Sequence, residues 1–489
     1  MRRTPDQLAS EPTTAPTPSI AEAAAGPAAT AGSAAPVLWP LHLGALLATF
    51  MFSVANVAVP AVKAGIGADD STSALVVGLF SAAFASGLIH CGRIGDRFGR
   101  RRLFALGTGL LVITSLAVGL SPESGTLLVT RTAQGLAAAL MMPQILASFQ
   151  HSLTGAARLK AISLFGAFSG LGTVGGQVLG GGLISAFGQT WGWRAAFLSC
   201  GVAAAAAFLG SLRLTESRSS EAQSLDVPGA TLLGVSMICL VIGLALGPVT
   251  GWLPLPAVLL LVSALGFAAF AVWQNTAEAT GRHPLIPPQV VSVTAAWVGM
   301  AMAFIFFAGF GSFLFDFSLV SQIGHVDPAY VSGLTLTVFA AAFLIVSLYV
   351  PRIVARLSGP GTMLLGTGLQ ISGLLGIAWV SVSTGTDWHL WFQVPGLILG
   401  AGQALQFGPL VGTVVNAVPD RLAGLSGGLI ATMQQAGIAV GVALLGALFH
   451  TFTDAFGFDV AFSLTCLTQI LLSIIFGAGA WHLHRTPRE

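Results

Sequence analysis

The stretch Gly92-Arg-Ile-Gly-Asp-Arg-Phe-Gly-Arg-Arg-Arg102 decides the fold. It holds five arginines and one aspartate, and it lies between two long apolar runs, 75–91 and 103–120. An arginine at the centre of a membrane helix costs about 3 kcal/mol on insertion scales. We therefore predict that this stretch is a short loop at a membrane surface, on the cytoplasmic side because it is so basic. The glycines on either side of Asp96 suit a tight turn.

The composition of the whole chain supports a membrane protein. Of 489 residues, 54% are hydrophobic and 8% are charged, with a mean hydropathy of +0.85, whereas soluble domains carry about 25% charged residues. The net charge of +2 gives no support for a nucleic-acid partner. The four cysteines lie in apolar runs without metal-site spacing, and no paired carboxylates or Ser-His-Asp arrangement occur in polar segments. We therefore expect that the protein binds no cofactor or metal and that it is not an enzyme.

The apolar pattern gives the number of spans and their orientation. Residues 1–36 are rich in Ala, Pro, Thr and Ser, which predicts a disordered cytoplasmic tail. Beyond the tail, apolar segments long enough to span a bilayer predict about fourteen helices. They lie near 38–60, 74–92, 103–121, 126–148, 160–187, 195–213, 227–247, 254–273, 294–315, 331–350, 362–382, 390–415, 424–449 and 460–482. An even number of spans puts both termini on one side of the membrane. All but three of the 20 Lys and Arg residues then lie in the cytoplasmic loops and tails.

A weak internal repeat indicates how the spans are grouped. Pro351-Arg-Ile-Val-Ala-Arg-Leu-Ser-Gly359 follows the tenth span as the basic stretch follows the second. Repeated halves are common in transporters. The predicted organisation is a six-helix bundle over 37–215, a linker over 216–289 that carries two inserted helices, and a second six-helix bundle over 290–484. Asp226-Val-Pro-Gly229 predicts the start of the first inserted helix, with Asp226 as its N-cap.

Two motifs carry a family resemblance. The spacing G-x-x-x-D-R-x-G-R-R in the basic stretch resembles the loop between helices 2 and 3 of the major facilitator superfamily, and Arg131-Thr-Ala-Gln-Gly135 resembles the helix-4 motif of that family. The resemblance implies an all-α polytopic fold that works by alternating access. It also implies that Asp96 faces the start of a helix near Gly424 and latches a cytoplasmic gate. The gate residues would be Gly92, Asp96, Arg97, Gly99, Arg100 and Arg101.

Two further stretches resemble the fourteen-helix drug:proton antiporter branch, each with a departure. Ser53-Val-Ala-Asn-Val-Ala-Val-Pro60 is similar to the helix-1 signature of that branch, and Asn56 is one of the matches. Met51 stands where the branch has an acid, so proton coupling at that position is not implied. Gly176-Gln-Val-Leu-Gly-Gly181 resembles the antiporter motif of helix 5, but Gln177 replaces its proline.

Charged residues within spans are the main candidates for the site. Asp316 lies inside the apolar run 304–319, and an acid within a membrane is a functional hypothesis by default. The alternative is a span that ends early and leaves Asp316 in an outer loop. Arg131 and Gln134 share a helix face, and the arginine either faces a cavity or reaches the outer interface.

Scattered amides complete the candidate cavity. Asn56, Gln177, Gln403, Gln406 and Gln434 are polar residues in apolar helices, where they line a cavity or join helices. Together with the resemblance, they predict a monomeric exporter of amphipathic organic compounds in the plasma membrane, in contact with lipid and driven by proton entry. One alternative is a transporter or uniporter for a specific metabolite without proton antiport. A remoter one is a membrane sensor or scaffold that does not transport.

Overall fold

The computed structural model describes residues 37–218, 225–252, 254–280, 282, 284–286, 290, 293–383, 387–417 and 423–485. The predicted tail, 1–36, lies outside these residues. All regular structure in the described part is helical, as predicted. The helices are α2 (Trp39–Ile66), α3 (Asp70–Phe98), α4 (Arg100–Gly119), α5 (Ser124–Ser152), α6 (Gly155–Ser211), α7 (Val227–Thr250), α8 (Leu255–Ala279), α10 (Thr294–Leu319), η1 (Val320–Gly324), α11 (Ala329–Thr335), α12 (Thr337–Leu357), α13 (Gly359–Ser383), α14 (Trp388–Trp391), α15 (Gln393–Ala417), α16 (Ala423–Phe456) and α17 (Phe458–Arg485).

The lengths of these helices fit a chain that crosses the membrane many times. Within the described residues, 12 helices are long and apolar enough to span a bilayer. Helix α6 counts once among them, although its 57 residues are broken at Gly188, where φ is 71°. A straight helix of that length would extend for about 85 Å, far more than a bilayer. Helix α5, with 29 residues, is not among the 12. The predicted count of about fourteen is compatible with this arrangement.

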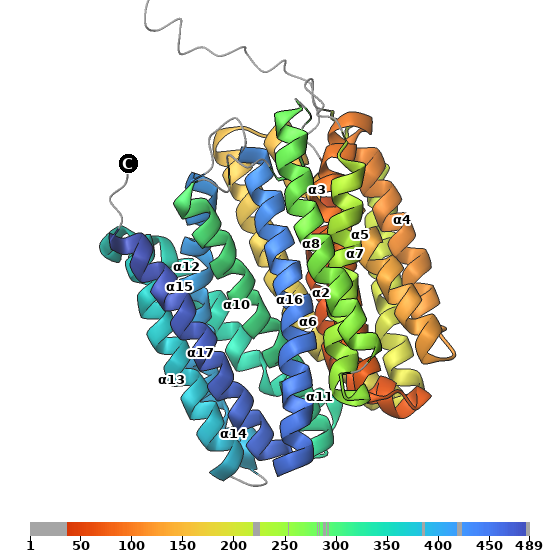
Figure 1. Ribbon diagram of the computed structural model, residues 1–489, viewed down its shortest axis with the longest axis vertical. Coiled ribbons are helices and arrows are strands. Elements are labelled where there is room, and N and C mark those ends of the chain that lie inside the picture. Colours follow the sequence, from red (N-terminus) through yellow and green to blue (C-terminus); the bar gives the residue numbers. More distant parts are fainter. Residues whose placement is uncertain are drawn as a thin grey trace, which may run out of the picture. The chain divides into compact units, whose positions relative to one another are not determined.

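The helices pack in two groups, and α7 lies against both of them (Figure 1). In the first group, α2 packs on α6, α3 on α5, and α4 on both α5 and α6. In the second, α10 packs on α16, while α13 contacts α15 and α17, and α12 contacts α15. Helix α7 packs on α8 and on α3 and α16, one from each group. The groups also meet directly through α3 and α16, α2 and α10, and α6 and α11.

The basic stretch is not the loop that we expected. Helix α3 continues to Phe98, and α4 begins at Arg100, so Gly99 alone separates them. Gly99 has a φ of 115°, which favours glycine. Gly95 is helical and serves packing instead, because a Cβ there would lie 2.0 Å from Oε1 of Gln144 on α5. Arginines at the ends of two spans can leave the hydrocarbon by extending their side chains, without a separate loop.

Glycines allow α6 to lie close to α2. A Cβ on Gly172 would lie 2.2 Å from the backbone oxygen of Leu46, and one on Gly176 would lie 2.7 Å from that of Phe50. A Cβ on Gly170, by contrast, would meet nothing within 4 Å. Small residues let membrane helices approach through their backbones. The glycine-rich stretch therefore sets the contact between these helices on one face only.

We expect Gly172→Ala to destabilise the protein and Gly170→Ala to leave it unchanged or slightly more stable. The first change forces α6 away from α2, at a cost of about 1–3 kcal/mol. The second adds a better helix former where there is space, a gain of up to about 1 kcal/mol. Thermal unfolding of the two purified variants in the same detergent measures the difference. Equal melting temperatures would contradict this account of the α2–α6 contact.

Candidate functional site

The basic end is the end of the helices that carries Arg97, Arg100, Arg101 and Arg102. The other end of the helices is the opposite end. At the opposite end the two groups of helices are in contact. Nε2 of Gln322 in η1 donates to the backbone oxygen of Val57 in α2 at 3.0 Å. On α6, a Cβ on Gly181 would lie 2.4 Å from the backbone oxygen of Ala329 in α11. The opposite end is therefore closed along these elements.

Asp316 lies inside α10, as one of the two sequence alternatives requires. Its side chain is fully buried, and neither carboxylate oxygen has a hydrogen-bond partner among the described residues. Cys466, buried on α17, is near enough that an ionised Asp316 would act on its thiol. One turn earlier on α10, Oγ of Ser312 accepts a hydrogen bond of 3.1 Å from Gln469, also on α17. An ionised carboxylate without partners is costly in such a place, whereas a protonated one is not.

Several predicted cavity residues share this lack of partners. The amide of Gln177 on α6 is 3% exposed and has no partner at either polar atom in the described part of the chain. It lines a small cavity of about 20 Å³ between α6, α10, α11 and α12. Asn56 donates to the backbone oxygen of Phe52 at 2.9 Å, but its own oxygen is unpaired in the described residues. Buried polar atoms normally have partners, so these atoms indicate places where water or a ligand enters.

The glutamines of α15 and α16 are less uniform. Gln403 and Gln406 are buried, and each keeps an amide oxygen without a partner among the described residues. Nε2 of Gln406 donates to Oγ1 of Thr367 at 3.1 Å, so this residue also joins α15 to α13. Gln434 is half-buried on α16. That these residues contact a substrate stays a prediction.

Arg131 is buried within the first group of helices. Its side chain has no exposed surface, so it does not reach the interface. Nε donates to the backbone oxygen of Val76 on α3 at 2.8 Å, and Nη1 donates to Oε1 of Gln134. The guanidinium also lies over the rings of Phe80 and Phe197, 4.3 and 5.3 Å from their centres. Cation–π contacts of this kind are strongest where water is excluded.

The structure does not bring Arg131 and Asp316 together. No ion pair joins them in the described residues, and the contacts of Arg131 lie on α3, α5 and α6, all in the first group of helices. Nε2 of Gln134 donates to Oγ of Ser115 on α4 at 2.8 Å, so its polar contacts also lie within the first group of helices. The two charges are separate features, and a direct effect of the arginine on the acid finds no support.

The predicted gate residues surround the junction of α3 and α4. Asp96 is paired with Arg100 across Gly99, with distances of 3.0 and 2.7 Å from Nε and Nη2 to Oδ1. Arg97 is exposed and lies beside the Phe98 ring. Gly92 is helical. The expected contact of Asp96 with the start of α16 involves residues 418–422 and the side chains after them, which lie outside the described part.

Two partners of the basic stretch were missed by sequence reasoning. Glu216, after α6, accepts a hydrogen bond of 3.1 Å from the backbone nitrogen of Arg101 and pairs with Arg102 at 3.7 Å. Arg93 donates to the backbone oxygen of Pro284, in the linker after α8. A polar linker residue gives no local sign of such a long-range partner, so the sequence contained no usable signal.

Asp226 caps the start of α7, as predicted, and also bonds to α8 and to the linker after it. Its Oδ1 accepts from the Gly229 backbone at 2.9 Å and from Nε1 of Trp273 at 2.8 Å. Its Oδ2 accepts from Nε2 of Gln274 and from the Leu285 backbone, both at 3.0 Å. Burial alone would raise the pKa of Asp226, but these four hydrogen bonds outweigh burial and lower the pKa. The carboxylate therefore ties α7, α8 and the following linker together at the basic end.

We expect Asp226→Asn to lower the free energy of unfolding by about 2–4 kcal/mol near neutral pH, because the new NH₂ group faces backbone and side-chain donors. The wild-type carboxylate has a lowered pKa, so its contribution is present above the ordinary aspartate pKa of about 3.9 and is lost as the pH falls through the lower folded value. The gap between the two proteins should thus shrink below about pH 4. Melting curves across pH measure it; a constant gap would contradict the assignment.

Comparison with known proteins agrees with this architecture. A family model described as "Major Facilitator Superfamily" matches residues 41–442. The tetracenomycin C resistance and export protein of Streptomyces glaucescens is 30% identical over 84% of this chain and 75% of its own length. A probable actinorhodin transporter of Streptomyces coelicolor is 32% identical over 81% of this chain and 69% of its own.

A solved structure shares the fold. The crystal structure of a POT family transporter in complex with 5-aminolevulinic acid superimposes with a TM-score of 0.67, covering 92% of this chain and 96% of that one. The sequences are 14% identical, so the likeness concerns the fold alone.

Proposed function

The chain belongs to the major facilitator superfamily, and from this we propose that it exports amphipathic organic compounds across the plasma membrane in exchange for protons. It is an integral membrane transporter and not an enzyme. Export is supported by the similar proteins, two of which are named for the export or transport of tetracenomycin C and actinorhodin. The substrates would be bulky, weakly polar or cationic compounds, because the polar lining of the candidate cavity consists mainly of scattered amides.

The observation that carries proton coupling is Asp316. Asp316 is a fully buried acid on α10, and its oxygens have no partner among the described residues, so it can take up a proton without rearranging a salt bridge. Loss of that proton creates a charge that the surroundings do not compensate, which favours a change to a conformation with access to water. Protonation and conformation are then linked, as proton-driven exchange requires.

The proposed movement is rocking of two bundles, 37–215 and 290–484, with α7 and α8 as an inserted pair. Contacts between the bundles at the opposite end, including the bond from Gln322 to Val57, support a conformation closed at that end. Under the positive-inside rule the basic end is cytoplasmic, as are both termini, so this conformation is closed towards the outside. Opening to the outside would break these contacts, and Asp96 and its neighbours at the basic end would then close the cytoplasmic side.

A transport screen tests the proposal. Inverted membrane vesicles that contain the protein are offered a panel of fluorescent amphipathic compounds, with and without an imposed pH gradient, acidic inside. Accumulation that requires both the protein and the gradient is expected for at least part of the panel. Absence of accumulation for every compound, with the protein present and folded in the vesicles, would contradict export.

One alternative within the family is a metabolite transporter or uniporter without proton antiport. It is favoured by Met51, which is fully buried where related antiporters carry an acid, and by Gln177 in place of a proline. Counterflow in liposomes separates the two. A uniporter exchanges labelled for unlabelled substrate and gains nothing from a pH gradient, whereas an antiporter concentrates substrate when the gradient is applied.

A further inference from the structure

A second cavity, which Asp316 does not line, lies at the opposite end. Its volume is about 570 Å³, and the ends of α3, α7 and α16 line it and leave it partly open. Asp70 and Ser71 line it from α3, His450 and Asp454 from α16, and Pro248 with its neighbours from α7. The volume lies within the range of about 300–1,000 Å³ typical of sites for drug-sized molecules. None of the predicted substrate residues lines this cavity, so it is a separate feature.

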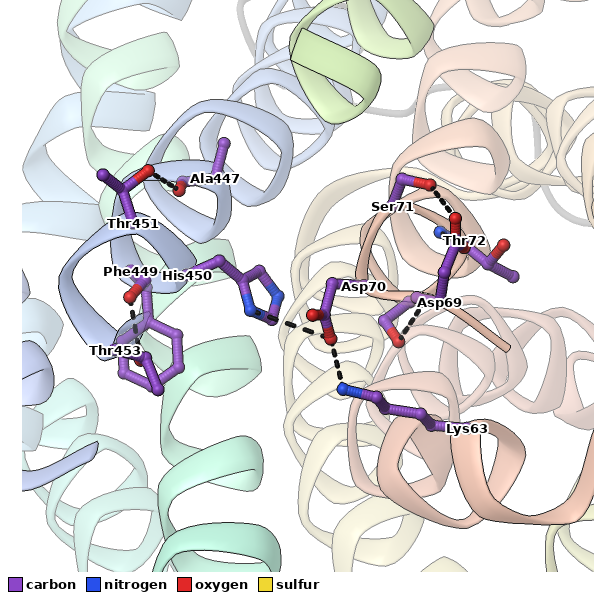
Figure 2. A network of polar contacts seen from close by, with 11 residues as sticks. Lys63, Asp69, Asp70, Ser71, Thr72, Ala447, Phe449, His450, Thr451 and Thr453 are labelled. Carbon is purple, nitrogen blue, oxygen red and sulfur yellow. Dashed lines mark hydrogen bonds and ion pairs between the residues drawn. The ribbon is translucent and has the colours of Figure 1, made fainter. Parts of the chain in front are cut away.

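A polar network crosses the wall of this cavity (Figure 2). Oδ1 of Asp70 pairs with Nζ of Lys63 on α2 and lies 3.8 Å from Nδ1 of His450 on α16. Figure 2 shows the aspartate and the histidine pointing toward each other from α3 and α16. Nε2 of His450 is buried and has no partner among the described residues.

The charges around the cavity select the class of ligand. Lys63 balances Asp70, while Asp454 is exposed and adds a second negative charge. With His450 neutral, one negative charge is uncompensated, which favours a monovalent cation and disfavours an anion. A metal ion does not fit, because no group of three or more His, Cys, Asp or Glu in the described residues is arranged to hold one.

The apolar part of the lining favours an organic cation over a small inorganic one. The acids of the lining come from α3 and α16, whereas all the lining residues of α7 are apolar: Ala245, Pro248 and Val249. A ligand with a charge at one side and an apolar body at the other would meet both surfaces. This is the arrangement expected of a site that binds by apolar contact and fixes orientation by a few polar groups.

We propose that the cavity between α3, α7 and α16 is a second binding site, for a monovalent amphipathic organic cation. The charged group of the ligand pairs with the carboxylates of Asp454 and Asp70, and its apolar body lies against α7. Because Asp70 and His450 belong to different bundles, a ligand held between them stabilises the closed opposite end. The inference rests on the proposed function for the class of compound, but the site itself is independent of proton coupling.

Protection of an introduced thiol tests the site. Thr451, an exposed residue of the lining, is replaced in Thr451→Cys, and the purified full chain in lipid nanodiscs is treated with a hydrophilic maleimide. Tetraphenylphosphonium is the probe cation. We expect it to slow the labelling in a saturable manner and the concentration for half-protection to rise about fivefold when Asp454→Asn is added. The chain without Thr451→Cys reports any labelling of native cysteines.

Two further variants make the result decisive. Ala245→Trp fills the cavity from the α7 side and should abolish protection, whereas Glu123→Gln removes an acid outside the cavity, next to α5, and should change nothing. Protection that is absent, or that is unaffected by both Asp454→Asn and Ala245→Trp, would overturn the proposal. Vesicle transport of the wild-type chain is measured alongside. Protection without transport would refute the proposed function and leave this site standing, and the reverse result would do the opposite.

Discussion

Asp316→Asn should reduce proton-driven accumulation in inverted vesicles to the level of vesicles without the protein. Asparagine has nearly the shape of a protonated aspartic acid but cannot release a proton. The variant would therefore behave as the protein does when Asp316 is protonated, and it could not release a proton during the cycle. The path for the substrate stays intact. Exchange of labelled for unlabelled substrate without a pH gradient should persist. Loss of one activity with retention of the other distinguishes a proton carrier from a structural residue.

Controls separate coupling from folding. The native acid is buried and has no hydrogen-bond partner in the part of the chain that the structure describes, so replacing it by a neutral amide should change the free energy of unfolding by no more than about 1 kcal/mol. Asp316→Glu keeps a titratable group and should recover part of the gradient-driven transport. If Asp316→Asn accumulates substrate as the wild type does, Asp316 has no part in coupling, and the alternative without proton antiport gains support.

Arg131→Lys should be the most destabilising conservative change in the first bundle. The guanidinium serves the Val76 oxygen, the Gln134 amide and two aromatic rings at once. The single ammonium group of lysine cannot reproduce the planar guanidinium, whose separate N–H groups reach different acceptors. At least one buried acceptor would lose its partner, at a cost of about 1–3 kcal/mol each, and the ring contacts would weaken as well. We expect a loss of about 2–4 kcal/mol in unfolding free energy.

Thermal unfolding in detergent measures this loss. Arg158→Lys is the matched control, because Arg158 is exposed on α6 and the same change there should alter stability by less than about 0.5 kcal/mol. Arg131→Lys should also lower transport, since the bond from Arg131 to Val76 and the ring contact with Phe197 that tie α5 to α3 and α6 would be weakened. A variant as stable and as active as the wild type would show that the buried guanidinium is dispensable.

Features encoded within one helix were predictable from the sequence. The continuous apolar run 304–319 favoured a place within the membrane for Asp316, with an outer loop as the alternative, and Asp316 is buried in α10. Arg131 and Gln134 were placed on one face by their spacing, and they are bonded to each other. The N-cap at Asp226 followed from its position before Val-Pro-Gly, and the bond to Gly229 confirms it. Local spacing and hydropathy suffice for such features.

Features that depend on which helices meet were not predictable. Nothing near Asp70 in the sequence indicates His450, and nothing near Arg102 indicates Glu216. These pairs arise from the packing of α3 on α16 and from the path of the chain after α6. The predicted loop over the basic stretch was wrong for a different reason. The many arginines of this stretch were taken to exclude a helix there. Arginine side chains at the end of a helix can, however, extend out of the membrane.

The most direct test of the central claim uses the purified chain in liposomes. An imposed pH gradient drives transport of a fluorescent organic cation, while a pH-sensitive dye inside the liposomes reports the protons that move in the opposite direction. We predict that both movements require the protein, begin together and disappear together in Asp316→Asn. Substrate movement that is unaffected by the gradient, with no accompanying proton flux, would contradict proton-coupled export by this protein.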